Sequence, residues 1–382
     1  MAAPVIQVLA GACLVLAALG LVYLAAALIA VRGFCRRPAE KAETTPAATI
    51  LKPLRGADPE LYANLLSFRR QAYPEHQLVL GVADAEDEAV SIARRLIADE
   101  PGADIALVVE PRSHGRNHKV GNLLNMLPAA RHDILVIADS DMRALPGYLR
   151  QVLAPLDDPA IGVVTCLYVG KPVDGRLWSS LGAAFINHHF LPMALLGRLL
   201  GEREGCFGAT IAFRRADLEA AGGLGRIADL LADDHALGQL VCNRGKRIHL
   251  SRNLVTNMVH EPSLAALFAH ELRWSRTIRA IAPASHLGTV VTHPLALSLL
   301  ASLFAWTTPL TPIALAGFGV ILAFRFAQVR ATERILGLEP APLRNVPLRD
   351  VLSFVVWCAS FWGKSVRWRG QEFRIEADGR LV

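Results

Sequence analysis

The sequence has little charge, and two long stretches of it have none. Only 19% of its 382 residues are charged, whereas 53% are hydrophobic. Histidine apart, no charged residue occurs from 2 to 31 or from 280 to 324. About 20 apolar residues cross the hydrocarbon core of a bilayer, so both stretches are long enough to span one. The residues between them, about 40 to 280, have the ordinary composition of a soluble domain.

Motifs for several other chemistries are absent. The six cysteines form no CxxC pair, and HELRW (270–274) lacks the second histidine of HExxH, which argues against a zinc site. No GxxxxGK[ST] occurs, so a P-loop is excluded. The net charge is +6, but no run of Lys and Arg extends beyond a few residues, so nucleic-acid binding has little support. Nothing in the sequence requires an obligate protein partner.

The apolar stretches predict a multi-pass membrane protein. The first is too long for a signal peptide and lacks a basic start, so a transmembrane anchor is favoured over a signal peptide or a core helix. Arg32, Arg36 and Arg37 follow it, which places this end in the cytoplasm. The expected division is an anchor at 1–37, a cytoplasmic soluble domain at 38–259, an interfacial helix at 260–285, a transmembrane hairpin at 286–330, and an interfacial or re-entrant segment with a basic cytoplasmic tail at 331–382.

The soluble domain alternates between strand and helix patterns. Apolar runs predict strands over 48–51, 77–84, 103–110, 134–138 and 161–170. Helical patterns separate them, from Asp58–Pro59 to about 72 and over 86–100, 120–130 and about 146–156. This alternation predicts an α/β fold whose sheet is mostly parallel and flanked by helices.

Acidic residues follow two of the predicted strands. Asp84 ends the second strand, and Asp139 and Asp141 follow the fourth in VIADSDMRA (136–144). Ligands bind at the carboxyl ends of parallel strands, so Asp84 and Asp139 should share one edge. Two close carboxylates favour Mg²⁺ or Mn²⁺, which also accept substrate phosphates, and a nucleotide diphosphate would fit. The alternative is a surface turn with two solvated acids.

Three further segments carry groups suited to such a ligand. SHGRNHKVGN (113–122) opens a helix and offers backbone N–H groups, Arg116 and Lys119 to a phosphate, unless it is only a polar loop. Asn122 in the same segment is a further candidate for binding the donor. The glycines of GCFG (205–208) could let backbone approach a substrate, or form a turn before a helix. In LLADDHALG (230–238), Asp233 and Asp234 precede a helical pattern; a partly desolvated carboxylate there suits a general base, or one of the pair caps the helix.

HEPSLAALFAHELRWSRTIRAIA (260–282) predicts an amphipathic helix in the membrane interface. Its arginines recur every three residues and therefore share one side. Arg273 could contact a diphosphate while Trp274 lines an acceptor pocket. A helix that only anchors the chain is the alternative.

Taken together, these motifs resemble the ceramide glucosyltransferase family of GT-A inverting glycosyltransferases, and most of all its bacterial, hopanoid-biosynthesis-associated branch. The similarity covers nearly the whole chain and is carried, in order, by KPLRG, VADAED, NHKVGNL, IADSD, FRRADLEAAGGL, ADD, the xxxRW motif and WRGQEFRI.

The resemblance implies a role for each matching residue. Asp84 would contact the uridine, Asp139 and Asp141 would bind metal and diphosphate, and Asp234 would be the catalytic base. The family's Q/RxxRW motif falls on His270, Arg273 and Trp274, with His270 in place of the usual Gln or Arg. Asp233 stands where relatives often have Glu.

The implied reaction is transfer of a sugar from a UDP-sugar to a lipid hydroxyl with inversion at the anomeric carbon. UDP-N-acetylglucosamine and bacteriohopanetetrol are the favoured pair for the hopanoid branch, with ceramide or a diacylglycerol as the other acceptors. The chain would lie in the bacterial cytoplasmic membrane. Two rivals stay open, a membrane-tethered sugar-nucleotide sensor and an aspartyl-phosphate phosphatase, although Arg143 stands where the phosphatase motif has Thr or Val.

Overall fold

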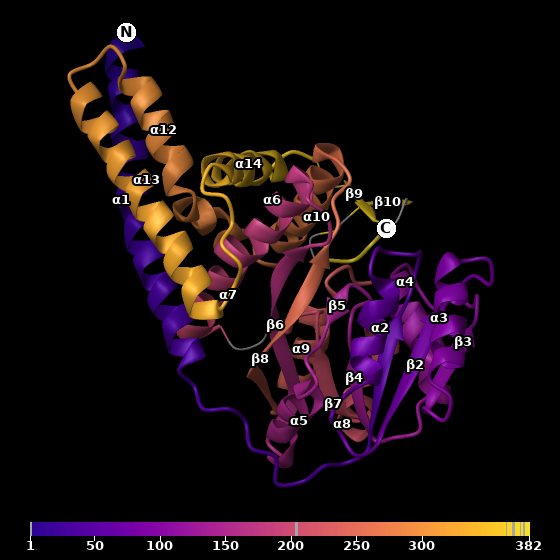
Figure 1. The fold of residues 1–382 in the computed structure, drawn as a ribbon. Coiled ribbons are helices and arrows are strands. Elements are labelled where there is room, and N and C mark those ends of the chain that lie inside the picture. The colour runs from indigo at the N-terminus through magenta and orange to yellow at the C-terminus, as the bar shows by residue number, and fades with distance from the viewer. Residues whose placement is uncertain (1, 203–204, 364, 369–370, 375, 377–378) are drawn as a thin grey trace. The chain divides into compact units, whose positions relative to one another are not determined.

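The computed structural model describes residues 2–202, 205–363, 365–368, 371–374, 376 and 379–382. The chain forms two compact units (Figure 1). The sheet unit comprises residues 37–175, 201–260 and 379–382, and the helical unit comprises residues 1–36, 176–200 and 261–378. Residues 176–200 therefore pack with the helical unit, although the sequence division assigned them to the soluble domain.

The sheet unit contains one large sheet. Its strands are β1 (Ala48–Pro53), β2 (His76–Val82), β3 (Ile105–Val109), β4 (Ile134–Ile137), β5 (Met142–Arg143), β6 (Ile161–Pro172), β7 (Ile211–Arg214) and β8 (Arg247–Val259). Its helices are α2 (Leu61–Arg69), α3 (Glu88–Asp99), α4 (His118–Met126), η1 (Leu127–Ala129), α5 (Tyr148–Leu153), η2 (Ala154–Asp157), α8 (Arg215–Ala220), η4 (Leu224–Ile227) and α9 (Asp233–Cys242).

The strand order is β3-β2-β1-β4-β7-β6-β8-β5. Strands β3, β2, β1 and β4 run parallel to one another, β7 lies antiparallel between β4 and β6, and β6 is parallel to β8. Both faces of the central strands are covered by apolar clusters, which is why β1 and β4 are buried at every position. The predicted α/β fold with a mostly parallel sheet is confirmed.

Some local predictions differ from the structure. Helix α2 begins at Leu61 and not at Asp58–Pro59, because Glu60 takes a left-handed conformation with φ 70° and ends the preceding turn. Strands β7 and β8 were not predicted. Neither strand shows the regular alternation of apolar and polar residues by which a strand is recognised in a sequence.

The helical unit contains helices from three separate parts of the chain. They are α1 (Ala2–Cys35), α6 (Leu177–Phe185), the π-helical turn η3 (Ile186–Phe190), α7 (Leu191–Leu199), α10 (Leu264–Ile281), α11 (Pro283–Gly288), η5 (Thr289–Thr292), α12 (Pro294–Ala305), α13 (Thr311–Leu336) and α14 (Asn345–Ser360). An antiparallel pair of strands, β9 (Ser365–Trp368) and β10 (Gln371–Arg374), lies in the segment that the sequence predicted as a basic tail.

Two of these helices, residues 4–35 of α1 and all of α13, are long and apolar enough to cross a membrane. A third span is present if Pro283–Thr292 and Pro294–Ala305, which meet at a bend of 69°, count together. Helices α1, α12 and α13 lie side by side (Figure 1). Gly20 permits the contact of α1 with α12, because a Cβ there would lie 2.5 Å from the Pro294 Cβ.

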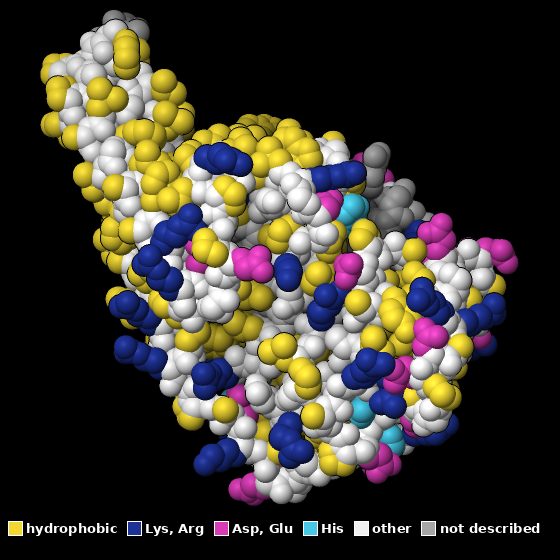
Figure 2. Space-filling view, viewed as in Figure 1, with side chains coloured by type: hydrophobic (Ala, Val, Ile, Leu, Met, Phe, Trp, Pro, Cys, Tyr) yellow, Lys and Arg dark blue, Asp and Glu magenta, His cyan; other side chains and the backbone are white. Residues whose placement is uncertain are grey.

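The outer surface of α1 is apolar. Val8, Val15, Val22 and Ile29 recur every seven residues, and each is more than 60% exposed. Figure 2 shows hydrophobic side chains gathered over these helices. An exposed stripe of large aliphatic side chains is unfavourable in water and favourable against lipid tails, so this surface has the character of a membrane-embedded face.

Candidate functional site

Three charged side chains of the sheet unit meet around Gly208. Asp139 follows β4, Asp234 lies in the first turn of α9, and Lys119 lies in the first turn of α4. A Cβ on Gly208 would be 3.3 Å from Asp139 Oδ2 and 3.5 Å from both Asp234 Oδ2 and Lys119 Nζ. The backbone N–H of Gly208 donates to Asp234 Oδ2 at 3.0 Å. A side chain at this position would therefore lie directly against these charges, and the approach of the GCFG glycines to a substrate stays a prediction.

The start of α4 fixes the position of Lys119. Asn117 caps the helix, and its Oδ1 accepts from the backbone N–H groups of Lys119 at 3.0 Å and Val120 at 3.1 Å. The Lys119 ammonium lies 2.6 Å from Asp139 Oδ1 and 3.5 Å from Asp233 Oδ2. Burial alone would lower the lysine pKa, but Asp139 and Asp233 raise it above its ordinary value. Lys119 is therefore a permanent positive charge.

The second carboxylate of the DxD pair, Asp141, is only partly satisfied. Its Oδ2 accepts a hydrogen bond of 2.7 Å from Asn257 Nδ2 on β8. Its Oδ1 is buried and has no hydrogen-bond partner among the described residues. Burial, followed by repulsion from Asp139, raises the pKa of Asp141 to about 6. A buried carboxylate oxygen without a donor is costly, so this atom is suited to a cation.

A second lysine, Lys52, lies beneath the DxD turn. It is fully buried, its ammonium donates to the Asp139 carbonyl oxygen at 2.6 Å, and the same nitrogen lies 3.7 Å from the centre of the Phe68 ring. Burial lowers its pKa to about 7, although Asp141 and Asp139 oppose this shift. Lys52 therefore fixes the backbone from which both carboxylates project.

These residues fit a divalent metal that takes few protein ligands. Mg²⁺ and Mn²⁺ prefer hard oxygen donors and complete their shells with water and phosphate oxygens. Asp139 and Asp141 supply such donors, and the unpartnered Oδ1 of Asp141 points to a missing positive charge. Within the described residues, no group of three His, Cys, Asp or Glu side chains could enclose a metal alone.

Asp234 has the surroundings of a general base. The N-cap of α9 is Ala232, without a side-chain hydrogen bond, so neither Asp233 nor Asp234 caps this helix. The two oxygens of Asp234 accept from the backbone N–H groups of Gly208 and His235. Burial and then repulsion from Asp233 raise the pKa of Asp234 to about 6, close to the pH at which a base works best.

Two predicted donor-binding residues lie apart from this cluster. Asp84 follows β2, which is separated from β4 by β1, so it shares the carboxyl edge with Asp139 at about two strand spacings, roughly 10 Å. It is exposed, and its Oδ1 accepts from Glu86 N at 3.0 Å. Asn122 is buried, and its Nδ2 donates to the Gly81 carbonyl oxygen at 2.8 Å, which ties α4 to β2. The amide of Asn122 is thus already used within the fold.

The xxxRW residues lie on α10 in the helical unit. His270 Nδ1 is 2.8 Å from Glu261 Oε1, and the His270 ring lies 4.4 Å from the Trp274 ring, centre to centre. On its other side, Trp274 stacks on Phe185 at 6.0 Å. The imidazole of His270 therefore pairs with a carboxylate and packs against the indole.

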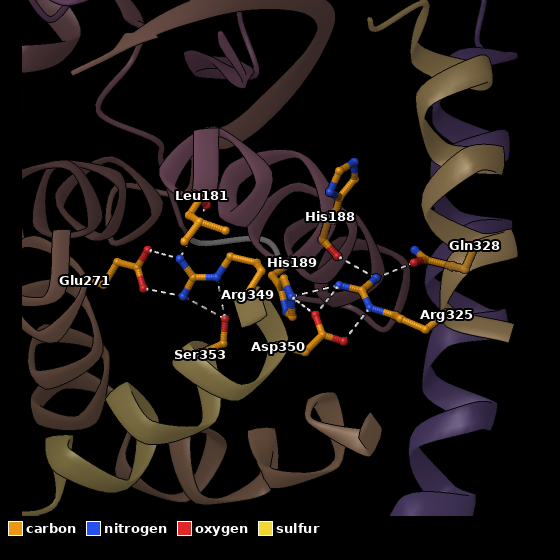
Figure 3. A network of polar contacts seen from close by, with 9 residues as sticks. All are labelled: Leu181, His188, His189, Glu271, Arg325, Gln328, Arg349, Asp350 and Ser353. Carbon is orange, nitrogen blue, oxygen red and sulfur yellow. Dashed lines mark hydrogen bonds and ion pairs between the residues drawn. The ribbon is translucent and has the colours of Figure 1, made fainter. Parts of the chain in front are cut away.

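A buried ion pair connects the same helix, α10, to α14. Glu271, beside His270, accepts two hydrogen bonds of 2.7 Å from Arg349 on α14 (Figure 3). The next residue of α14, Asp350, pairs with Arg325 of α13 at 2.8 Å and with His189 Nε2 at 2.8 Å. All of these side chains are buried or nearly so. Helix α14 thus links α10 to α13 through opposite charges.

Comparison with known proteins identifies the family. The family model described as Glycosyl transferase family 21 matches residues 12–381. The chain belongs to this family. The predicted resemblance to ceramide glucosyltransferases is confirmed, and the ordered set of short motifs that carried it spans the matched region.

Ceramide glucosyltransferases are among the curated relatives of the chain. It is 25% identical to ceramide glucosyltransferase 1 of Caenorhabditis elegans over 241 residues, which are 63% of this chain and 51% of the relative. It is 31% identical to the ceramide glucosyltransferase of Komagataella phaffii over 148 residues, 35% of this chain and 29% of the relative. The chain spans about half the length of the first of these relatives.

A solved structure shares the fold. The mannosyltransferase PcManGT from Pyrobaculum calidifontis, in complex with GDP-Man and Mn²⁺, superposes with a TM-score of 0.54. The sequences are 20% identical, and the superposition covers 92% of this chain and 99% of the mannosyltransferase. The GT-A type of sheet implied by the sequence is therefore confirmed.

Sequence reasoning missed three parts of the site. Lys52 was part of the quoted KPLRG motif, but a lysine ending a buried strand was given no role. Asn257 lies on the unpredicted β8, so nothing placed it near Asp141. Gly208 was considered only as one of several glycines. The signal available for Lys52 was its position, since a lysine directly after ATIL is expected to be buried and therefore to need a partner.

Proposed function

We propose that this chain is a membrane-bound inverting glycosyltransferase that moves a sugar from a UDP-sugar to a lipid hydroxyl. The observation that carries the proposal is the meeting of Asp139, Asp234 and Lys119 around Gly208 at one edge of the sheet. The relatives support it: ceramide glucosyltransferases act on a lipid, and PcManGT binds a nucleotide sugar with Mn²⁺. The sequence resemblance favours N-acetylglucosamine and bacteriohopanetetrol; ceramide or a diacylglycerol is the alternative acceptor.

The donor would lie along the carboxyl edge of the sheet. Asp84 would contact the uridine, and Asp139 with Asp141 would hold Mg²⁺ or Mn²⁺. When bound, the metal supplies positive charge that stabilises the leaving UDP. The ammonium of Lys119 adds a second positive charge beside the diphosphate. Lys52 keeps the DxD backbone in place through its bond to the Asp139 carbonyl.

Asp234 would remove the proton of the attacking lipid hydroxyl. Hydrogen bonds from Gly208 N and His235 N orient its carboxylate without protonating it. Its raised pKa keeps it basic enough to accept a proton and still ionised at neutral pH. The deprotonated oxygen attacks the anomeric carbon from the face opposite UDP, so the product has inverted configuration.

The lipid acceptor would arrive from the membrane. Trp274 would offer an apolar ring to the acceptor, and His270, Arg273 and Asp233 are each candidates to contact its polar end or the diphosphate. The apolar helices α1 and α13 explain how the enzyme stays with a substrate that does not leave the bilayer. We place the protein in the bacterial cytoplasmic membrane with the sheet unit facing the cytoplasm, as Arg32, Arg36 and Arg37 after the first span indicate.

The test is a transfer assay with the purified full chain in detergent and Mn²⁺. UDP-N-acetylglucosamine and UDP-glucose are offered separately with bacteriohopanetetrol, ceramide and diacylglycerol, and products are read by mass spectrometry. A glycolipid formed by the native chain and not by Asp234→Asn, which should still bind UDP, supports the proposal. UDP binding without any glycolipid would favour the sensor, and turnover by Asp234→Asn would remove this residue as the base.

A further inference from the structure

One carboxylate of the DxD pair, Asp139, already forms an ion pair with a lysine of the same chain, Lys119. Asp139 Oδ1 lies 2.6 Å from Lys119 Nζ, the length of a charge-assisted hydrogen bond. Lys119 is nine-tenths buried, whereas the Asp139 side chain is 31% exposed, so water screens this pair only in part. Asp141, in contrast, has a buried oxygen without a partner in the described part of the chain. A metal that bridges the pair must therefore share Asp139 with an ammonium ion.

We infer that Lys119 is an internal counter-ion that competes with a divalent cation for Asp139, so that the metal binds strongly only together with a nucleotide diphosphate. Two cations on one carboxylate repel each other, and the repulsion is large in a partly desolvated site. A diphosphate brings negative charge that attracts both cations, which turns their competition into a joint attraction. The naming of the diphosphate rests on the proposed function; the competition between Lys119 and a metal does not.

The geometry gives Lys119 an alternative partner. Asp233 Oδ2 lies 3.5 Å from the same ammonium, so a small rotation of the side chain exchanges one carboxylate for the other. The backbone need not move, because Asn117 caps α4 and holds Lys119 N at 3.0 Å. Gly208 leaves open the space in which these groups meet. The lysine side chain can therefore release Asp139 while the helix stays fixed.

The test measures the affinity of the full chain in detergent for Mn²⁺ alone, by the electron paramagnetic resonance signal of free Mn²⁺. Lys119→Met removes the charge and keeps most of the side-chain length, and Lys119→Arg keeps the charge. Lys246→Met is the matched control, because Lys246 pairs with Asp217 elsewhere in the sheet unit. Without nucleotide, Lys119→Met should bind Mn²⁺ at least tenfold more tightly than the native chain, whereas the other two variants should resemble it.

The same variant should change nucleotide binding in the opposite direction. At saturating Mn²⁺, Lys119→Met should bind UDP at least tenfold more weakly, because one positive charge beside the diphosphate is lost. A second variant, Lys119→Gln, and a thermal melt of each protein separate this effect from misfolding. Adding Asp139→Asn to Lys119→Met should abolish the gain in Mn²⁺ affinity, since the contested carboxylate is gone.

Competition therefore predicts that Lys119→Met binds Mn²⁺ more tightly and UDP more weakly than the native chain. Unchanged or weaker Mn²⁺ binding by Lys119→Met overturns the inference, and so does the absence of Mn²⁺ binding to every variant. If UDP binds to none of the proteins, the proposed function fails, and the Mn²⁺ measurement still decides whether Lys119 competes for Asp139.

Discussion

The buried pair of Glu271 and Arg349 allows a sharp test of what stabilises the helical unit. Two hydrogen bonds of 2.7 Å join the side chains, which are 3% and 2% exposed (Figure 3). Arg349→Met leaves a carboxylate buried without its partner. Breaking a buried ion pair from one side costs about 3–5 kcal/mol, because the remaining charge is not compensated.

Replacing both partners should cost far less. In the double variant Glu271→Met with Arg349→Met, no charge is left buried, and well-packed apolar side chains commonly stand in for a buried pair with little loss. The double variant also loses the bonds from Arg349 to Ser353 Oγ and the Leu181 carbonyl, so a residual loss of about 1–2 kcal/mol is expected. The double variant should therefore lose much less free energy of unfolding than the two single variants lose in sum.

Thermal unfolding of the full chain in detergent measures these differences. For a chain of 382 residues that unfolds as one, 4 kcal/mol corresponds to a change in Tm of about 5 °C. Arg247→Met is the control, because Arg247 and Asp158 form an exposed pair that should contribute less than about 1 kcal/mol. If the double variant melts as low as Arg349→Met, or if Arg349→Met melts like the native chain, the buried charge is not what destabilises the helix pair.

The loss of stability in Arg349→Met should also depend on pH. Burial raises the pKa of Glu271, while Arg349 opposes the shift. Without Arg349, burial is opposed only by the smaller effect of His270, so the folded-state pKa of Glu271 exceeds that of the unfolded chain. The protonated glutamic acid then favours the folded state at low pH, and this contribution is lost as pH rises through the folded-state pKa. The deficit of Arg349→Met should therefore be larger at pH 8 than at pH 5.

Three further outcomes follow from the site and the membrane segments. Because the pKa of Asp234 is raised to about 6, the kcat/KM of transfer should fall as pH drops below about 6; a profile flat to pH 4 would contradict its role as base. Gly208→Ala places a Cβ within 3.5 Å of three charged atoms and should lower transfer at least tenfold, whereas Gly175→Ala, with no atom within 4 Å, should leave it unchanged; equal rates would refute this. A reporter domain fused after residue 40 should appear in the cytoplasm, and a periplasmic signal would reverse the topology.

The carboxylates of the site could be predicted because strand ends carry a strong signal. Apolar runs identify β2 and β4, and parallel strands bring their carboxyl ends to one edge, so Asp84 and Asp139 had to share it. Asp234 was identified through its acidic neighbour at a helix start. These inferences need only the order of strands and helices. They give the edge on which a residue lies, and not the atoms that it touches.

The cations of the site could not be predicted in the same way. Lys119 was expected to contact a phosphate, and its pairing with Asp139 depends on the rotation of one side chain. Asn257 reaches Asp141 only because β8 pairs with β5, a strand of two residues with no periodic pattern. Contacts of this kind depend on strand register, and a shift of one residue would turn Asn257 to the other face of the sheet.

The balance of charge explains why the site suits a divalent metal. Asp139, Asp141, Asp233 and Asp234 carry four negative charges when ionised, and Lys52 and Lys119 carry at most two positive ones. At least two negative charges are therefore uncompensated, which equals the charge of Mg²⁺ or Mn²⁺. Burial, followed by repulsion from the neighbouring carboxylates, raises the pKa values of Asp141 and Asp234 to about 6, which agrees with a site short of positive charge. Hard oxygen donors with uncompensated charge suit a divalent cation, and on the inference above Lys119 would set how readily it binds without a nucleotide.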